Sequence, residues 1–229
     1  MNARILEIFH STQGEGKYAG VPQVFVRFFE CNMHCVWCDT PHSIGDTTRH
    51  YKEYPLEKLV DEISGLWGES HSVSLTGGEP LVQADFINHL TPVLKSKKMP
   101  VYLETNGILP KELSQTIDGV DIIAMDIKLP SSTGCREYWQ EHEEFLKIAR
   151  SKDLFVKVVI SKATTKEDVL RAADLVKRFA PEVPFILQPN FFDMKDGVVA
   201  RCVEFQKDCL KYLRDVRIIP QLHKFMKVR

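Results

Sequence analysis

The feature that most constrains the fold is an alternation of short apolar runs with longer amphipathic stretches along the 229 residues. Strands are predicted at the apolar runs 5–9, 24–29, 72–76, 101–105, 121–127, 154–160 and 185–189. Helices are predicted at 55–67, 83–97, 138–151, 164–179 and 197–213, where apolar residues recur at helical spacing. Such alternation is typical of βαβ units around a parallel sheet. The nearly continuous apolar runs indicate strands covered on both faces. We therefore predict an α/β fold, built as an open or partial barrel.

Composition limits the classes of protein that this chain can belong to. It is 44% hydrophobic and 27% charged, as in ordinary globular proteins, and its length suits one domain over 1–229. The formal net charge of −1 argues against a nucleic-acid binder, which should be visibly basic. We expect no signal peptide, because no long apolar run follows a basic segment at the start, and no membrane span, because no apolar run is long enough. We expect a cytoplasmic protein whose thiols stay reduced.

Three closely spaced cysteines follow the second predicted strand. Cys31, Cys35 and Cys38 have a CxxxCxxC spacing. An iron–sulfur cluster usually takes four cysteine thiolates, so three would leave one iron with an open position. The alternative is a closed Cys3His zinc site completed by His34 or His42, which would only stabilise the loop.

The other cysteines carry no such pattern. Cys202 and Cys209 are seven residues apart on a predicted helix, hence on one face, and we interpret them as small buried apolar residues. A second cluster is the alternative, but no further ligand lies near them in the sequence. Cys135 follows a Ser-Ser-Thr-Gly turn and receives no role.

Polar residues recur where the predicted strands end. The carboxyl ends of parallel strands form the sites of open sheets and barrels, and ordinary turn chemistry is the alternative explanation. In strand order these residues are Thr12–Glu15, the cysteine loop, Thr76 with Gly77–Pro80, Glu104–Gly107, Asp126 with Lys128, and Gln188–Asn190.

The cysteine spacing, Trp37 before the last cysteine and the GGEP segment Gly77–Pro80 together resemble the radical S-adenosylmethionine (SAM) superfamily. The resemblance implies a [4Fe–4S] cluster on the three cysteines, with SAM chelating the open iron. Reduction would then cleave SAM to a 5′-deoxyadenosyl radical, so that the cofactor carries the difficult step. It implies SAM contacts from Trp37, Cys38, Asp39, Gly77, Gly78, Glu79, Glu104, Asn106, Asp126, Ile127, Lys128, Gln188, Pro189, Asn190 and Phe191.

A narrower resemblance covers nearly the whole chain. QGEG, the arginine of VFVRFFECN, CDT, TGGEP, ETNG, DIKLPSS and QLHKFM together resemble the 7-carboxy-7-deazaguanine synthase family. The resemblance implies a short radical SAM protein with a trimmed barrel, usually a homodimer, that is reduced by a donor such as flavodoxin. Members convert 6-carboxy-5,6,7,8-tetrahydropterin to 7-carboxy-7-deazaguanine on the way to queuosine and other deazapurines. Ammonia is lost, SAM is regenerated and Mg2+ is required.

Site roles follow from this resemblance. Arg27 would grip the pterin carboxylate through two parallel hydrogen bonds, although a strand arginine is more often a surface residue. Thr40 would bind Mg2+, which otherwise takes substrate oxygens and waters. The remaining substrate contacts would be Thr12, Gln13, Gly14, Glu15, Thr76 and Arg229 with its terminal carboxylate. Histidines 10, 34, 42 and 223 are interpreted as supporting or surface residues.

Two other functions compete with this interpretation. A glycyl-radical activase would share CxxxCxxC and GGEP but should lack QGEG and the arginine. A non-catalytic, zinc-stabilised binding module would hold zinc without sulfide.

Overall fold

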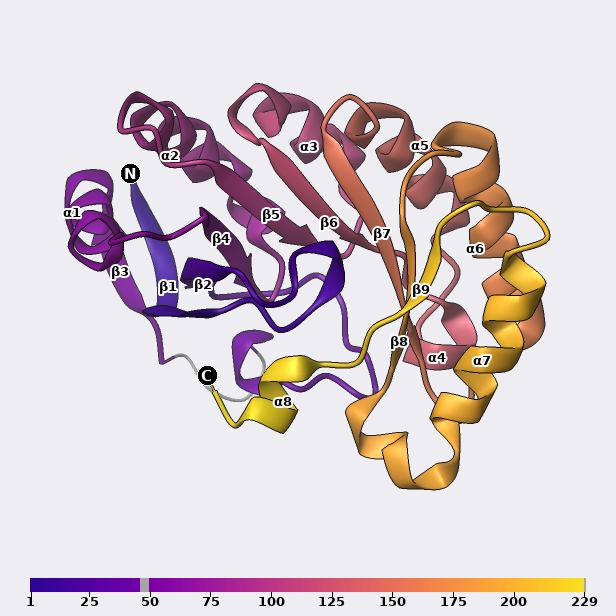
Figure 1. The fold of residues 1–229 in the computed structure, drawn as a ribbon. Helices are drawn as coiled ribbons and strands as arrows, with labels where there is room; N and C mark the ends of the chain where they lie inside the picture. The colour runs from indigo at the N-terminus through magenta and orange to yellow at the C-terminus, as the bar shows by residue number, and fades with distance from the viewer. Residues whose placement is uncertain (46–49, 229) are drawn as a thin grey trace.

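A computed structural model describes residues 1–45 and 50–228, which form a nine-stranded sheet (Figure 1). The strand order is β3-β1-β2-β4-β5-β6-β7-β8-β9, so within the described residues the sheet stays open between its edge strands. The strands are β1 Asn2–Thr12, β2 Pro22–Phe28, β3 Lys52–Pro55, β4 Ser72–Gly77, β5 Val101–Thr105, β6 Ile122–Asp126, β7 Asp153–Ile160, β8 Phe185–Pro189 and β9 Val216–Ile218. The predicted α/β architecture with a trimmed barrel is confirmed.

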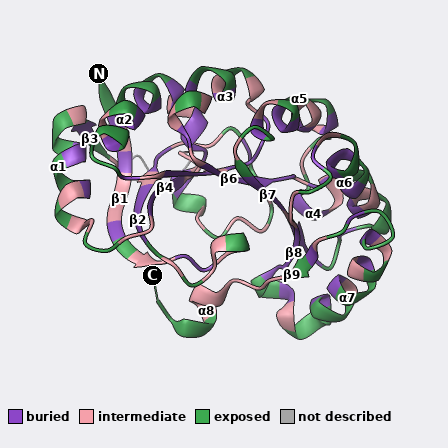
Figure 2. Ribbon diagram, turned by 45° about the horizontal axis from the view of Figure 1, so that its top comes forward, coloured by how far each residue is buried: buried purple, intermediate pink, exposed green. Residues whose placement is uncertain are grey.

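The helices lie outside the arc of strands, apart from a short C-terminal helix at its open side (Figure 2). They are α1 Leu56–Leu66, α2 Ala84–Ser96, α3 Pro110–Thr116, α4 Pro130–Thr133, α5 Trp139–Ala149, α6 Lys166–Phe179, α7 Val198–Cys209 and the C-terminal α8 Leu222–Met226. All five predicted helices are present within a few residues. The start of α6 was misplaced, because Thr165 rather than Thr164 accepts the capping hydrogen bond, from Asp168 N.

The first strand does not fit the predicted parallel arrangement. β1 is antiparallel to both β2 and β3, and the strands from β2 to β9 are parallel. Thr12 therefore lies beside Pro22, at the start of β2 and away from the cysteine loop at its far end. The turn after β1 reaches the concave face from the opposite edge of the sheet, not from the shared carboxyl edge.

The two faces of the sheet have different chemistry. On β7, Leu154, Val156, Val158 and Ile160 belong to the apolar core shared with the helices, and the intervening side chains face the concave side. Each fully buried aliphatic side chain contributes about 1.5–3 kcal/mol to folding, so this outer layer supplies most of the stabilising burial. The prediction that the strands are covered on both faces is confirmed for the inner strands, because every residue of β6 and β8 is buried. A second, smaller apolar cluster, which includes Tyr102, Phe155 and Ile186, lies apart from the outer core.

A β-bulge in β1 turns an acidic side chain toward the concave face. The register with β2 shifts between Ile5 and Glu7. Ile5 lies in the outer core, and after the shift the concave side receives Phe9, whose ring stacks on Phe25 at 5.1 Å. The same shift places Glu7 beside Arg27 of β2, which determines the environment of that arginine.

The structure also bears on two cysteines of α7 and on membrane spans. Cys202 and Cys209 are both fully buried in the core beneath α7, which confirms their interpretation as small apolar residues. In the part of the chain that the structure describes, no helix has the length and apolarity needed to cross a membrane.

Candidate active site

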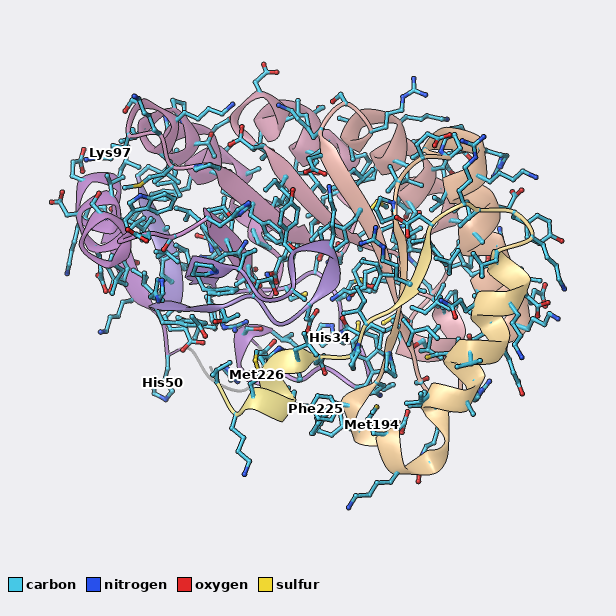
Figure 3. All side chains as sticks on the ribbon, in the orientation of Figure 1. His34, His50, Lys97, Met194, Phe225 and Met226 are labelled. Atoms are coloured by element: carbon cyan, nitrogen blue, oxygen red, sulfur yellow. The ribbon has the colours of Figure 1, made fainter. Side chains whose placement is uncertain are left out.

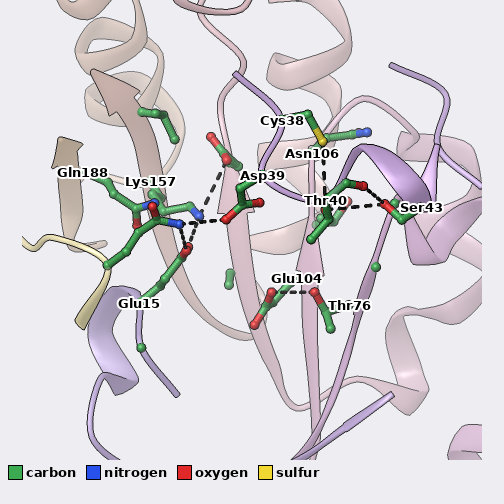
Figure 4. A pocket seen from close by; sticks show the side chains of 18 of the residues that line it. Glu15, Cys38, Asp39, Thr40, Ser43, Thr76, Glu104, Asn106, Lys157 and Gln188 are labelled. Atoms are coloured by element: carbon green, nitrogen blue, oxygen red, sulfur yellow. Dashed lines mark hydrogen bonds and ion pairs between the residues drawn. The ribbon is translucent and has the colours of Figure 1, made fainter. Parts of the chain in front are cut away.

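The concave face holds a cavity of about 240 Å³ into which most of the predicted site residues point (Figure 4). It brings together residues from the turn after β1, from the cysteine loop and from the carboxyl ends of the parallel strands. The predicted residues that line it are Thr12, Gln13, Gly14, Glu15, Arg27, Cys31, Cys35, Trp37, Cys38, Asp39, Thr40, Thr76, Gly77, Gly78, Glu104, Asn106, Asp126, Lys128, Gln188 and Asn190.

Other predicted residues lie outside this lining in the described structure. Ile127 is fully buried among the outer-core residues, and Pro189 follows the same alternation at the end of β8. Phe191 is partly exposed, and its ring meets that of Phe225. Glu79 lies beneath the cavity, as described below. Arg229 is outside the described residues.

The three cysteines lie on a loop that several neighbouring segments hold in place. None is in a disulfide, and each is partly exposed. The loop is anchored to the helix α4 segment, since Val36 N donates to Thr133 O at 3.0 Å and Trp37 Nε1 donates to Ser132 Oγ at 3.0 Å. Trp37 is thereby fixed beside the cavity.

The thiols have the chemistry of metal ligands that must first lose a proton. Burial, together with the charge of Glu79, raises the pKa of Cys31 to about 11, and burial raises the pKa of Cys35 to about 12. Across residues 1–45 and 50–228, no three His, Cys, Asp or Glu side chains are grouped so that they could hold a metal ion. A cubane cluster does not require such a grouping, because each thiolate binds a different iron atom. Three partly exposed thiols that are in no disulfide supply three of the four thiolates that such a cluster usually takes.

The two glycines of the GGEP segment sit against the chain's own backbone. Gly77 has φ of +138°, and a Cβ there would lie 2.2 Å from Phe28 O. A Cβ on Gly78 would lie 2.2 Å from Glu30 O and 2.9 Å from Cys31 Cβ. The glycines thus let the end of β4 pack directly on the segment that leads into the cysteine loop.

Glu79 braces the same region from below. Its fully buried carboxylate accepts hydrogen bonds from Leu81 N at 3.1 Å, Thr105 Oγ1 at 3.0 Å and Asn106 N at 2.7 Å. Burial raises the pKa of Glu79 to about 7, because the loss of solvent outweighs these donors. Asn106 in turn donates to Asn32 Oδ1 at 2.7 Å, which ties β5 to the cysteine loop.

Glu104 joins residues predicted for two different ligands. Its carboxylate accepts hydrogen bonds from Gln13 Nε2 at 2.8 Å and Ser74 Oγ at 3.2 Å. It also accepts one from Thr76 Oγ1 at 2.7 Å, which Figure 4 shows. Gln13 and Thr76 were predicted to contact substrate, and Glu104 was predicted to contact SAM. The structure therefore places these residues in one network.

Two buried acceptors in the cavity have no donor within the described structure. They are Asp126 Oδ1 and Gln188 Oε1. A buried polar atom without a hydrogen bond is unfavourable by about 1–3 kcal/mol, so both atoms call for a ligand that carries hydroxyl or amino groups. SAM carries such groups on its ribose and methionine moieties, and the residues present therefore fit it.

Arg27 has a partly free guanidinium. Its Nε donates to Glu7 Oε1 at 2.7 Å, and its side chain is 18% exposed. Its terminal nitrogens have no partner in the described part of the chain, and the residue lines the cavity. Arg27 can therefore donate hydrogen bonds from its terminal nitrogens to a carboxylate, while Glu7 keeps the arginine side chain in place.

Thr40, predicted to bind Mg2+, lies at the edge of the cysteine loop. Its Oγ1 is 3.9 Å from Cys38 Sγ and 3.4 Å from Ser43 Oγ. The hydroxyl faces the cavity beside the thiols. This position leaves room for an ion whose other ligands come from substrate and water.

The C-terminal segment crosses the open side of the cavity. Leu222 N donates to Gly14 O at 2.8 Å, and Lys224 Nζ lies 3.4 Å from Asp39 Oδ2. The side chain of His223 packs against Gly14 and lines the cavity. Phe225 and Met226 of this segment, labelled in Figure 3, are exposed. The segment thus links the turn after β1 to the cysteine loop.

Several residues of the cavity lining were missed or underrated in the sequence, among them one from β7 and two from the C-terminal segment. Lys157 of β7, Gln221 and His223 all line the cavity. Lys157 forms ion pairs with Glu15 and Asp126. A single charged residue in the apolar run 154–160 was the available signal for Lys157, because alternation turns it to the concave face.

Comparison with known proteins agrees with the architecture. The family model described as the radical SAM superfamily matches residues 26–187. Among solved structures, the crystal structure of QueE from Escherichia coli superimposes with a TM-score of 0.70 at 23% identity, covering 97% of this chain and 95% of that one. The chain therefore has the fold of, and belongs to, the radical SAM superfamily.

Curated relatives narrow the assignment. The 7-carboxy-7-deazaguanine synthase of Geobacter sulfurreducens is 39% identical over 98% of this chain and 97% of its own. That of Archaeoglobus fulgidus is 35% identical over the full length of both. The chain belongs to the 7-carboxy-7-deazaguanine synthase family. Membership in this family excludes the hypothesis of a zinc-stabilised binding module and does not favour the hypothesis of a glycyl-radical activase.

Proposed function

We propose that this chain converts 6-carboxy-5,6,7,8-tetrahydropterin to 7-carboxy-7-deazaguanine, with loss of ammonia and regeneration of SAM. The names of the curated relatives support the reaction, and the observation that carries it is the position of Arg27. This arginine offers free terminal nitrogens to a carboxylate in the same cavity that the three cluster thiols line. A carboxylated substrate held there would lie next to the cofactor.

The cofactor sites of the proposal use residues of the cysteine loop and the strand ends. Cys31, Cys35 and Cys38 would hold the [4Fe–4S] cluster and leave one iron open. Together, cluster and SAM supply the radical that abstracts a hydrogen atom. The SAM contacts proposed from the cavity lining are Trp37, Cys38, Asp39, Gly77, Gly78, Glu104, Asn106, Asp126, Lys128, Gln188 and Asn190. Glu79, Ile127, Pro189 and Phe191, the other residues predicted for SAM, lie outside this lining and would act only by supporting it. The unpartnered oxygens of Asp126 and Gln188 support this placement most directly.

The substrate side of the proposal uses the turn after β1. Arg27 would bind the carboxylate, and the polar edge of the pterin would be read by Thr12, Gln13, Gly14, Glu15 and Thr76, with Arg229 closing the site. Gln13 is 3% exposed and already bonded to Glu104 and Gln23, so its amide is held in one orientation. A pre-oriented amide discriminates between hydrogen-bonding edges without further ordering.

Thr40 would bind Mg2+ in this proposal. Its hydroxyl lies beside Cys38 at the cavity, where a cation could neutralise the substrate carboxylate. Thr40→Ala should raise the Mg2+ concentration needed for half-maximal activity by about tenfold, as expected for the loss of one ligand. A magnesium titration of both proteins measures this, and an unchanged midpoint would remove Thr40 from the metal site.

Assembly and location complete the proposal. We propose a single domain, a homodimer, an electron donor such as flavodoxin, and a cytoplasmic location. All six cysteines are free in the structure, which fits a reducing compartment. Sedimentation of the purified protein tests the dimer. Reduction of the cluster by flavodoxin in place of a chemical reductant tests the donor.

The activity is tested by anaerobic reconstitution followed by a product assay. Protein with a full cluster receives SAM, reductant, Mg2+ and the carboxypterin, and 7-carboxy-7-deazaguanine is measured by mass spectrometry. Cys38→Ala, which removes one thiolate, is the control and should form no product. A fully loaded wild-type protein that binds SAM and makes no deazaguanine refutes the proposal.

A further inference from the structure

A row of alternating charges crosses the concave face between the two proposed ligand sites. Lys157 of β7 pairs with Glu15 on one side and lies 3.7 Å from Asp126 on the other. Asp126 receives the ammonium of Lys128 at 2.8 Å, and Lys128 Nζ lies 5.1 Å from the centre of the Trp37 ring. No role has so far been given to Lys157, although it stands at the middle of this row.

The fold fixes Lys157 in this position. Its neighbours on β7, Val156 and Val158, are fully buried against the helices, so its own side chain must face the cavity. The lysine side chain is only 15% exposed. A buried ammonium is tolerated only when carboxylates pair with it, and here two do. Burial would lower the pKa of Lys157, but Glu15 and Asp126 raise it above its usual range. The group is therefore a fixed positive charge and does not serve as a base.

Each end of the row belongs to a different ligand in the proposed function. Glu15 is held by Lys157 and by Gln221 Nε2 at 2.7 Å. Burial alone would raise the pKa of Glu15, but Lys157 lowers it to about 2, so this carboxylate stays ionised as an acceptor. Asp126 has one oxygen bound to Lys128 and the other buried without a partner. Lys157 therefore connects an acceptor proposed for the pterin to an acceptor proposed for SAM.

Lys157 lies closer to Glu15 than to Asp126, so a ligand that binds Glu15 can shift the lysine toward Asp126. Lys157 is in hydrogen-bond contact with Glu15, whereas 3.7 Å to Asp126 is too long for a hydrogen bond. Pterin donors that bind Glu15 would weaken its hold on Lys157. The ammonium could then approach Asp126 and fix that carboxylate, with its unpartnered oxygen turned to SAM.

We propose that Lys157 is a positioning residue that couples the binding of the pterin to the binding of SAM, so that each ligand tightens the other. This inference rests on the proposed function. Coupling is reciprocal, and values between about 5-fold and 150-fold are typical when one ligand changes the affinity for another. The wild-type protein should therefore bind SAM at least about 5-fold more tightly when the carboxypterin is present.

Equilibrium dialysis on the anaerobic holoprotein without reductant tests the coupling, because no turnover takes place. The Kd of SAM is measured without and with saturating 6-carboxy-5,6,7,8-tetrahydropterin, and the Kd of the pterin without and with SAM. In Lys157→Met the two ratios should fall close to 1, and Lys157→Arg should restore part of the effect. Lys147→Met is the matched control, since Lys147 pairs with Glu143 on the exposed face of α5 at 2.7 Å. It should leave both ratios unchanged.

Each outcome decides between distinct possibilities. A wild-type protein that binds both ligands independently overturns the inference, and so does a Lys157→Met protein that keeps the wild-type ratios. A variant that binds both ligands more weakly but with unchanged ratios shows a merely structural role and also overturns it. Where Lys157→Met does not load its cluster, Glu15→Gln breaks the same link and must lower the ratios. Wild-type protein that binds SAM but no carboxypterin refutes the proposed function instead.

Discussion

The packing of β4 on the cysteine loop makes Gly78 a sensitive position. In Gly78→Ala the new methyl group would start 2.2 Å from Glu30 O and 2.9 Å from Cys31 Cβ. Ordinary contacts begin near 3.4 Å, so the backbone that leads into the loop must move by about 1 Å. Neither neighbour is the end of a flexible side chain, and the strain therefore cannot relax locally.

The expected effect has two parts. Overpacking of this kind lowers the free energy of unfolding by about 1–3 kcal/mol, measured by urea titration of the cluster-free protein. The displacement also moves Cys31 relative to Cys35 and Cys38, so the iron and sulfide bound per chain after reconstitution should fall well below the wild-type value.

Gly65→Ala is the matched control. Gly65 lies in α1, and a Cβ there meets nothing within 4 Å. The substitution should stabilise the protein by about 0.5–1 kcal/mol through helix propensity and leave iron content unchanged. If Gly78→Ala matches the wild type in both stability and iron content, the steric argument for the GGEP segment is refuted.

Three further predictions concern the site. Arg27→Lys leaves a single ammonium group to bind both Glu7 and the substrate carboxylate. The loss of one charge-assisted hydrogen bond, worth about 1.5–3 kcal/mol, should raise KM for the carboxypterin roughly tenfold or more with little change in kcat. An unchanged KM would contradict this role of Arg27. Burial raises the pKa of Glu79 from 4.5 to about 7, so the folded protein binds this proton more tightly than the unfolded chain does. The free energy of unfolding of the wild type should therefore fall by up to about 3 kcal/mol as the pH rises from 4.5 to about 7. Glu79→Gln should lack that component; urea titrations of both cluster-free proteins at pH 5 and pH 8 measure it, and identical slopes with pH would disprove the shift. Gly14→Ala places a Cβ 2.2 Å from the ring of His223, so limited trypsin digestion should cut the C-terminal segment faster than in wild type, and an unchanged rate would contradict the packing.

Much of the fold could be predicted because the outer face of the sheet is uniformly aliphatic. Runs such as 154–160 alternate between core and cavity, and their helices show clear apolar stripes. The strand β3 and the helix α3 were not predicted, since KEYP and PKELSQT are short and largely polar. Their formation depends on neighbours: β3 pairs with β1, and α3 packs near α2 and α5.

The prediction that β1 runs parallel to its neighbours was wrong, although the sequence contains the information needed to correct it. Residues 13–21 are too few for the crossover that a parallel pair requires, so the connection to β2 had to be a hairpin. The contacts within the site, by contrast, could not be predicted from the sequence. Glu15 and Lys157 are far apart in the chain, and no local pattern links them. Only the antiparallel first strand, which carries its turn across the concave face, brings them together.

The proposed reaction depends on three thiolates that leave one iron free to bind SAM beside the pterin site. Electron paramagnetic resonance of the reduced, anaerobically reconstituted protein tests it most directly, before and after SAM is added. We expect a [4Fe–4S] signal whose g values shift when SAM binds the open iron. A loaded cluster whose spectrum stays the same at saturating SAM would contradict it.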